Sequence, residues 1–513
     1  MAKSSRQTMG QTTARELLNF SPLSCFLTTL LLAFTFIIIF KHFSSLSSKR
    51  QRIPPGPKPW PIIGNIFHLG NKPYISMANF ARVHGPLISL RLGTQLLVVG
   101  SSPKAAAEIL RTNDRLLSGR QVPKVAPYEP QFMDRIALIW SSDCSDRWSF
   151  LRGLCKSELF SSKAIESQAR LREMKVAEMV DFLASREGKI VNIGEAVFAA
   201  VFNTMGNLLF SRDLINLKDG VLSSKLKSLV WKMLELGATP NISDFYPMLA
   251  PLDLQGLKRT TSRCIHGMFA TWAEHIKERR ESRNNNFQKA DFLDVCLANG
   301  FDNDQINWLL FELITAGTDT AATTVEWAMA ELLKNREVMK KAREELQKEI
   351  DCSNSLIESH VTQLPYLNAC VKETFRLHPP APLLVPHRAL ETCEVMGYTI
   401  PKDSKVMVNV WAIGRDSSLW EDPLSFNPER FLGSNLNFKG HDYELLPFGA
   451  GRRICPGLPM ATVQVHLILA SLIHCFDWSL PVGEDPSKLD MNEKFGITLQ
   501  KEQPLLFVPK RVV

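Results

Sequence analysis

A cysteine within a glycine-rich loop is the strongest chemical signal in the chain. Segment 447–457 reads Pro-Phe-Gly-Ala-Gly-Arg-Arg-Ile-Cys-Pro-Gly. Its glycines allow a tight turn or a close approach to a large, flat group. The neighbouring arginines, Arg452 and Arg453, favour the thiolate form of Cys455, and a thiolate can ligate haem iron. The spacing alone also allows a plain glycine-rich loop with a buried cysteine.

A second segment places an acid beside a hydroxyl. Residues 316–320 read Ala-Gly-Thr-Asp-Thr within an apolar pattern at 302–334 that predicts a helix. Glycine and threonine are poor helix formers, and a threonine hydroxyl can bond a carbonyl one turn earlier and bend the helix. A locally opened helix would leave room for a small ligand, and Asp319 and Thr320 supply an acid and a hydroxyl side by side. The alternative is a bent structural helix with a solvated Asp319.

Two side-chain pairs at helical spacing complete the set. Glu373 and Arg376 are three residues apart, and Trp148 and Arg152 are four apart, so each pair shares one helical face. In isolation, the first pair could be an exposed salt bridge worth about 0–1 kcal/mol. The second could be a surface cation–π contact.

The loop Phe448-x-x-Gly451-x-Arg453-x-Cys455-x-Gly457 resembles the haem-binding loop of the cytochrome P450 family. The other motifs follow the order of that family along nearly the whole chain. The resemblance implies that Cys455 is the axial ligand of the haem iron and that Arg453 pairs with a haem propionate.

The same resemblance implies roles for the remaining motifs. Thr320 would hydrogen-bond iron-bound dioxygen and Asp319 would feed protons through water, although the next residue is Ala321 where many relatives carry Ser or Thr. Trp148 and Arg152 would bind a propionate.

His387, in Pro386-His387-Arg388, is a further propionate candidate, with Arg388 as the competing choice. Pro428-Glu429-Arg430-Phe431 resembles the family partner of the Glu-x-x-Arg motif. Arg430 would then join Glu373 and Arg376 in a buried network that holds the haem loop.

The resemblance implies a monooxygenase with haem b that takes electrons from NADPH through NADPH–cytochrome P450 reductase and inserts one atom of O2 into a small substrate. The family's substrate-facing regions correspond to segments that are largely apolar here, so an apolar substrate is expected. They are 120–140, 205–245, 312–317, 383–385 and 495–498.

The residues of the motifs are most similar to those of plant microsomal enzymes of specialised metabolism. A benzylisoquinoline-type alkaloid is the favoured substrate, and terpenoid hydroxylation, oxidative phenol coupling or a rearrangement stay open. The rivals are a haem-binding sensor, a cofactor-free membrane scaffold, and an oxygen-independent isomerase or dehydratase. Asp319 with Thr320 disfavours the sensor, the co-occurrence of the motifs disfavours the scaffold, and Thr320 disfavours the isomerase.

The elements that must position these residues are mostly helices. Apolar periodicity predicts helices at 163–186, 254–284, 302–334 and 335–350. Ser102-Pro103 begins a helix through Leu110, and another helix starts just after the cysteine, at Leu458. Strands are expected at 87–92 and 95–99 as a hairpin, near 383–410, and at 494–508. The sequence therefore predicts a mainly α fold with a small β subregion, the P450 fold, in one catalytic domain.

The N-terminus predicts a membrane anchor. Residues 17–40 carry no charge, and about 20 helical residues cross the hydrocarbon core. The prediction is a luminal segment (1–21), a transmembrane helix (22–40), a basic flank with a proline-rich hinge (41–61) and a haem-thiolate domain (62–513). The more basic C-terminal flank places that domain in the cytosol at the endoplasmic reticulum. The alternative is a cleaved signal peptide.

Charge and cysteine content agree with this division. Of the net charge of +8 over 513 residues, +6 falls in residues 1–52, so the rest is nearly neutral. No basic stretch is interleaved with aromatics, so no nucleic-acid partner is expected. The ten cysteines include no Cys-x-x-Cys pair, which fits a reduced compartment.

Overall fold

The computed structural model describes residues 26–32, 34–35, 52–217, 225–281, 291–350, 356–361, 363–481, 483, 485 and 488–512. The chain forms two units, Met1–Ile53 and Pro54–Val513. In the first unit, residues 26–32 and 34–35 are helical and exposed. The remainder of the predicted anchor at 22–40, and most of the basic flank that follows it, lie outside the described residues.

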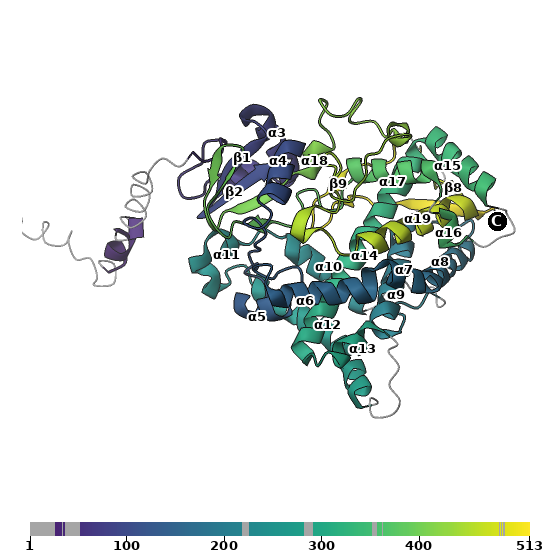
Figure 1. Ribbon diagram of the computed structural model, residues 1–513, viewed down its shortest axis with the longest axis horizontal. Coiled ribbons are helices and arrows are strands. Elements are labelled where there is room, and N and C mark those ends of the chain that lie inside the picture. The colour runs from purple at the N-terminus through teal and green to yellow at the C-terminus, as the bar shows by residue number, and fades with distance from the viewer. Residues whose placement is uncertain are drawn as a thin grey trace, which may run out of the picture. The chain divides into compact units, whose positions relative to one another are not determined.

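The core of the second unit is built around α14 (Asn303–Lys334). It begins at a capping box in which Asp302 and Gln305 satisfy each other's backbone N–H groups. Around it pack α9 (Ile193–Phe210), α17 (Pro365–Leu377) and α19 (Leu458–Cys475) (Figure 1). Helices α9 and α19 are long and apolar enough to span a membrane, but they are 83% and 67% buried within the body. Burial on all sides marks them as core helices.

Shorter helices complete the body. They are α2 (Ile66–Leu69), α3 (Pro73–His84), α4 (Pro103–Ala107), η2 (Glu108–Thr112), α5 (Pro130–Ile136), α6 (Asp146–Cys155), η3 (Lys156–Phe160), α7 (Ser162–Ser167), α8 (Ala169–Ala184), α10 (Lys225–Ala238), α11 (Ile242–Phe245), η4 (Pro247–Leu252), α12 (Leu257–Glu281), α13 (Phe292–Ala298), α15 (Arg336–Glu349), α16 (Glu358–Val361), α18 (Val410–Ile413), η6 (Pro428–Phe431) and η7 (Gly451–Arg453).

The largest sheet has the strand order β1-β2-β7-β4. Strands β1 (Leu87–Leu92) and β2 (Gln95–Gly100) form the predicted hairpin, with Leu92 opposite Gln95. Strand β7 (Lys405–Val408) runs parallel to β2, and β4 (His387–Arg388) is antiparallel to β7. The sheet therefore joins two segments that are about 300 residues apart in the sequence.

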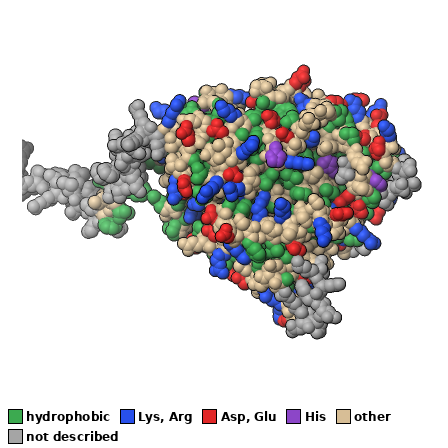
Figure 2. Space-filling view, viewed as in Figure 1, with side chains coloured by type: hydrophobic (Ala, Val, Ile, Leu, Met, Phe, Trp, Pro, Cys, Tyr) green, Lys and Arg blue, Asp and Glu red, His purple; other side chains and the backbone are tan. Residues whose placement is uncertain are grey.

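Three small sheets occupy the rest of the β subregion. One joins β3 (Val191–Asn192), β11 (Leu506–Arg511) and β8 (Phe476–Ser479). The others pair β5 (Cys393–Val395) with β6 (Tyr398–Ile400), and β9 (Glu493–Lys494) with β10 (Gln500–Lys501). Figure 2 shows acidic and basic side chains mixed over the visible face of the body, as its small net charge predicts.

The mainly helical fold with small sheets is confirmed, as are the helix at 302–334 and the hairpin. The prediction of one helix over 163–186 is wrong, because α7 and α8 are separate helices that meet at Gln168. Both bury their apolar sides in the same core, so the periodicity continues across the break. The helix that begins after Ser102 ends as a π-helical turn at 108–112, and the Ser102 hydroxyl caps it as predicted.

Candidate functional site

The cysteine loop is held as a tight turn in front of α19. Gly449 and Gly451 have φ values of +68° and +69°, a region that favours glycine. A Cβ on Gly451 would lie 2.1 Å from the carbonyl oxygen of Leu110, so no larger residue fits there. The Cys455 N–H donates to the Phe448 carbonyl at 3.0 Å. Gly457 precedes the first residue of α19, so the thiol lies at the positive end of this helix.

The Cys455 thiol is accessible, although protein atoms surround it densely. It borders a cavity of about 1190 Å³. Burial raises the pKa of Cys455, and the N–H groups of Gly457 and Leu458 together with the charge of Arg152 oppose that rise. The charge that favours the thiolate therefore comes from Arg152 rather than from the adjacent Arg452, which lies 3.4 Å from Asp114.

Arg453 is held by backbone carbonyl groups of two other segments, at Ser118 and at Ser141–Asp143. Its guanidinium donates to the carbonyl oxygens of Ser118 (2.9 Å), Ser141 (2.8 Å) and Asp143 (3.0 Å). It also lies over the Trp148 ring, 4.7 Å from the centroid. Arg453 thus joins the cysteine loop to the segment that precedes α6.

Trp148 and Arg152 lie on the same face of α6, as their spacing predicts. The Trp148 indole N–H donates to the Leu138 carbonyl at 2.9 Å, and Arg152 donates to the Ile454 carbonyl and lies 5.3 Å from the Trp148 ring centroid. The structure therefore brings Trp148, Arg152 and Arg453 together around one aromatic ring.

Sequence reasoning missed a further basic group, Arg120. It is buried and donates to the carbonyls of Val385 and Pro386 at 2.7 and 2.8 Å, while its Nε has no hydrogen-bond partner. Burial and the charge of Arg453 lower the pKa of Arg120 to about 9, so it stays cationic at neutral pH. A single arginine between Gly119 and Gln121 carries no local pattern that would reveal this burial.

His387 belongs to the same cluster. Its Nδ1 lies 2.7 Å from the Leu117 carbonyl, and burial with the charges of Arg120 and Arg453 holds the pKa of His387 well below its usual range. Arg388 leaves the opposite side of β4 and lies 3.6 Å from Asp403, because successive strand residues point to opposite faces. The charges of this cluster are therefore those of Arg120 and Arg453, and we refer to these two arginines together with His387 as the cation cluster.

Helix α14 presents Ala316 and Thr320 on one side. The Thr320 hydroxyl donates to the Ala316 carbonyl at 2.8 Å, one turn earlier, as a threonine in mid-helix commonly does. Ala316 is exposed and Thr320 is partly exposed, although most of the helix is buried. The helix continues without a break through 316–320. This side of α14 therefore faces an internal space.

Asp319 points elsewhere and is buried. Its carboxylate accepts hydrogen bonds from the Thr498 hydroxyl and from the Gln500 amide at 3.0 Å. Burial raises the pKa of Asp319, and these two neutral donors oppose the rise. Asp319 is thus tied to the C-terminal hairpin β9–β10, a contact between groups almost 180 residues apart that the sequence did not reveal.

Glu312 is a second buried acid on α14 that sequence reasoning missed. Its carboxylate accepts the backbone N–H groups of Leu138 and Ile139 at 2.6 and 3.0 Å. Burial raises the pKa of Glu312 to about 7, and these N–H groups partly offset that rise. Because Leu138 also accepts from Trp148, Glu312 holds the segment that the predicted propionate residues contact. Two turns before Thr320, it lies on the same helical face.

Glu373, Arg376 and Arg430 form a buried network. Arg376 binds both carboxylate oxygens of Glu373 at 2.7 Å, and Arg430 reaches the same group at 3.1 Å. The side chains of Glu373 and Arg376 are completely buried. Phe375, which precedes Arg376, packs edge-on against Phe448 with 5.3 Å between the ring centroids. The network is thus joined to the cysteine loop through one aromatic contact.

The residues fit a haem group. Among the described residues, no group of three or more His, Cys, Asp or Glu could hold a metal ion, so an iron bound by Cys455 must bring its other ligands with it, as a porphyrin does. Within the same residues, the cation cluster forms no ion pair with a carboxylate, and all its pKa values are lowered. The two propionates of a haem would supply the missing negative charge.

Comparison with known proteins agrees with this chemistry. Residues 54–507 match the family model "Cytochrome P450". The chain is 49% identical to a probable (S)-N-methylcoclaurine 3'-hydroxylase isozyme 2 of Coptis japonica, over 94% of this chain and 97% of that protein. It is 48% identical to isozyme 1 of Papaver somniferum (92% and 98%) and 41% identical to geraniol 8-hydroxylase of Catharanthus roseus (94% and 98%). The chain belongs to the cytochrome P450 family.

Proposed function

We propose that this monooxygenase hydroxylates an alkaloid of the benzylisoquinoline type. The observation that supports the substrate class most is the similarity, at 48–49% identity over more than nine tenths of the chain, to two N-methylcoclaurine 3'-hydroxylases. The terpenoid hydroxylase in the comparison is less similar, at 41%. Terpenoid hydroxylation is therefore the second candidate, and phenol coupling or rearrangement would use the same residues.

Haem b, reduced by NADPH electrons through a reductase, supplies the activation of O2 and the transfer of one oxygen atom to the substrate. In our proposal Cys455 binds its iron, and the cation cluster with Trp148 and Arg152 binds its propionates. Phe448, Gly451 and Gly457 shape the loop that brings Cys455 into place. Glu373, Arg376 and Arg430 hold that loop in position.

Protons are the protein's second contribution in this proposal. Thr320 offers a hydroxyl on the partly exposed side of α14. Asp319, one residue earlier, is the acid, and burial shifts its pKa upward while the hydrogen bonds from Thr498 and Gln500 oppose that shift. General acid catalysis of this kind needs a pKa close to the working pH. Ala316, one turn before Thr320, carries a small side chain and is exposed, which leaves space for substrate beside Thr320.

The test is turnover with isotopic oxygen. The full chain, reconstituted with reductase and NADPH under labelled O2, is offered (S)-N-methylcoclaurine and geraniol in parallel. We expect one labelled oxygen atom in the alkaloid product. A labelled product from geraniol, with no turnover of the alkaloid, would overturn the alkaloid assignment and favour a terpenoid substrate. Product without label would overturn hydroxylation in favour of an oxygen-independent reaction, and haem binding with no turnover of any candidate would favour the sensor.

We also infer the membrane arrangement expected from the sequence: residues 1–21 in the lumen, 22–40 across the endoplasmic reticulum membrane, 41–61 as the hinge and 62–513 in the cytosol. An exposed apolar surface near the hinge supports this inference. Its side chains are 59–78% exposed. We refer to them as the apolar patch: Trp60, Ile62, Phe67, Met248, Leu252 and Leu254.

Protease protection tests this arrangement. In sealed microsomes that contain the full chain, added protease should digest residues 62–513 and leave a protected fragment shorter than the first 61 residues. Complete protection of the chain would place the body in the lumen. Release of the whole chain by carbonate would contradict a membrane anchor.

A further inference from the structure

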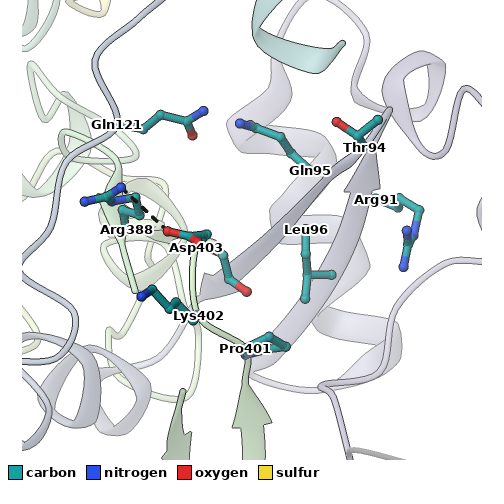
Figure 3. Close-up of a pocket in the computed structure, with 10 residues that line it drawn as sticks. Arg91, Thr94, Gln95, Leu96, Gln121, Arg388, Pro401, Lys402 and Asp403 are labelled. Carbon is teal, nitrogen blue, oxygen red and sulfur yellow. Dashed lines mark ion pairs between the residues drawn. The ribbon is translucent and has the colours of Figure 1, made fainter. Parts of the chain in front are cut away.

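A basic pocket on the body is lined by residues outside the cysteine loop. It has a volume of about 530 Å³ and lies between the β1–β2 hairpin and the turn at 401–404. Arg388, Lys402 and Asp403 lie on one side of it, and Arg91 and Thr94 on the other (Figure 3). We refer to this site as the basic pocket.

The charges of the basic pocket are unbalanced. Arg91, Arg388 and Lys402 face a single acid, Asp403. The Arg388–Asp403 contact is long, at 3.6 Å, and the Asp403 side chain is 64% exposed. Within the described residues, Arg91 and Lys402 make no ion pair. Such a cluster attracts an anion, since two positive charges remain without a partner.

Polar atoms in its wall also lack partners. Ser404 is 3% exposed and its hydroxyl makes no hydrogen bond, and the Nε of Arg388 is buried without one. A buried donor without a partner costs about 1–3 kcal/mol, so a bound acceptor would remove that penalty. The pocket also presents the amides of Gln95 and Gln121, whose ends point toward one another in Figure 3. Arginine with hydroxyl and amide donors suits a phosphate group.

The basic pocket adjoins the apolar patch. Thr94, on its rim, donates from its backbone N–H and its hydroxyl to the Phe245 carbonyl at 3.0 and 2.9 Å. The next residue, Tyr246, donates to the Ile62 carbonyl at 3.2 Å, and Gly93 donates to the Ile63 carbonyl at 3.2 Å. The hairpin turn therefore touches both segments that carry the patch. A ligand with an anionic head and apolar tails would match this pairing of surfaces.

We propose that the basic pocket binds the phosphate-containing head of an anionic phospholipid, with the acyl chains lying along the apolar patch. The inference rests on the proposed membrane location. The occupant is a lipid rather than a soluble phosphate compound because the hairpin turn at the rim of the pocket is hydrogen-bonded to the two segments that carry the exposed apolar side chains.

The test uses the full chain in phosphatidylcholine nanodiscs that contain a minority of phosphatidylinositol, with native mass spectrometry of the lipids that stay bound. We expect the wild type to retain phosphatidylinositol in preference to phosphatidylcholine. Arg91→Gln with Lys402→Gln should weaken this preference about fivefold for each cation removed. Ser404→Ala should weaken it without changing the net charge. The matched control removes two charges from α15, Lys340→Gln with Lys348→Gln, and should retain the preference.

Two further measurements separate the outcomes. Inorganic phosphate is titrated against thermal unfolding of the same proteins. Stabilisation by phosphate without any preference for phosphatidylinositol would overturn the lipid assignment. The assignment would also be overturned if the double variant, Arg91→Gln with Lys402→Gln, retained as much phosphatidylinositol as the wild type. Carbonate extraction tests the membrane location independently. A chain that stays in the membrane but shows no anionic preference contradicts this inference alone, whereas a chain that leaves the membrane contradicts the proposed location.

Discussion

In the proposed function, Cys455 is the residue on which the reaction depends most directly. We expect Cys455→Ala to abolish the red-shifted absorption of the reduced, carbon monoxide-bound protein, because alanine offers no thiolate to the iron. The measurement is the difference spectrum of the full chain. The control is Cys264→Ala, which removes a partly exposed thiol from α12. A normal spectrum for Cys455→Ala would refute the ligand assignment.

Glu312 connects stability to pH. Burial raises its folded-state pKa from 4.5 to about 7, and an acid with a raised pKa destabilises the fold as pH rises through the interval between its unfolded and folded values. The penalty above that interval is at most about 3 kcal/mol. Glu312→Gln does not titrate, so its free energy of unfolding should rise relative to wild type between about pH 4.5 and 7.

Denaturant unfolding of the full chain across this range measures the effect. Glu312→Asp keeps a titrating carboxylate and serves as the control. The difference between the unfolding free energies of wild type and Glu312→Gln should therefore change with pH. A difference that stays constant from about pH 4.5 to 7 would show that Glu312 does not titrate in that range.

At the scale of elements, the cysteine loop depends on how closely it approaches η2. In Gly451→Ala the new Cβ would meet the Leu110 carbonyl at 2.1 Å in a left-handed backbone conformation. We expect the loop to shift and haem incorporation to be largely lost. The matched control is Gly433→Ala, with φ +70° and no atom within 4 Å of the new Cβ. Gly433→Ala carries the same backbone cost of about 1–2 kcal/mol without the collision. Similar haem contents in both variants would therefore show that the contact with the Leu110 carbonyl does not position the cysteine loop.

The junction of α17 and η6 depends on Glu373. In Glu373→Gln the buried Arg376 loses its charge partner, and breaking a buried pair costs about 3–5 kcal/mol. We expect a lower unfolding midpoint and less haem-loaded protein, measured by thermal unfolding and absorbance. Glu344→Gln, on an exposed pair with Lys340, should change stability by less than about 1 kcal/mol. Equal effects of the two substitutions would rule out a structural role for the network.

At the scale of the whole molecule, the cavity beside Cys455 is bordered by four basic side chains (Arg152, Lys156, Lys372 and Lys439) and three acidic ones (Glu166, Glu173 and Glu358). A reductase with an acidic face would be attracted there, because charge complementarity speeds association. We expect Lys156→Glu with Lys439→Glu to slow the reductase-driven reduction of the haem about tenfold at low salt. Stopped-flow reduction under carbon monoxide measures this rate. Lys340→Glu, on α15, is the control, and an unchanged rate in the double variant would place the reductase on another surface.

The fold was predictable where the pattern is local. The helix at 302–334 carries its own apolar period and its own cap, and the 87–92 and 95–99 strands flank a Gly-Thr turn. The local pattern did not predict the break at Gln168, because the two helices on either side of it bury their apolar sides in the same core. The local pattern also did not predict the parallel pairing of β2 with β7, because the residues around Leu97 carry no information about their distant partner, Lys405.

The sequence by itself determined the chemistry of this protein. The cysteine loop, the acid–hydroxyl segment of α14 and the Glu-x-x-Arg motif are each short, continuous segments, so their residue types and spacing can be recognised without the structure. The division of charge between the N-terminus and a nearly neutral body is equally a property of composition.

Only the tertiary structure decided which distant groups serve these motifs. Arg120 meets Arg453, Glu312 holds the backbone at Leu138, and Thr498 binds Asp319 across separations of about 170 to 330 residues. The Glu312 contact joins a side chain to backbone N–H groups, which every residue except proline carries, so it leaves no signature in residue type. The other contacts, and the basic pocket, join side chains that only the folding of the chain brings together.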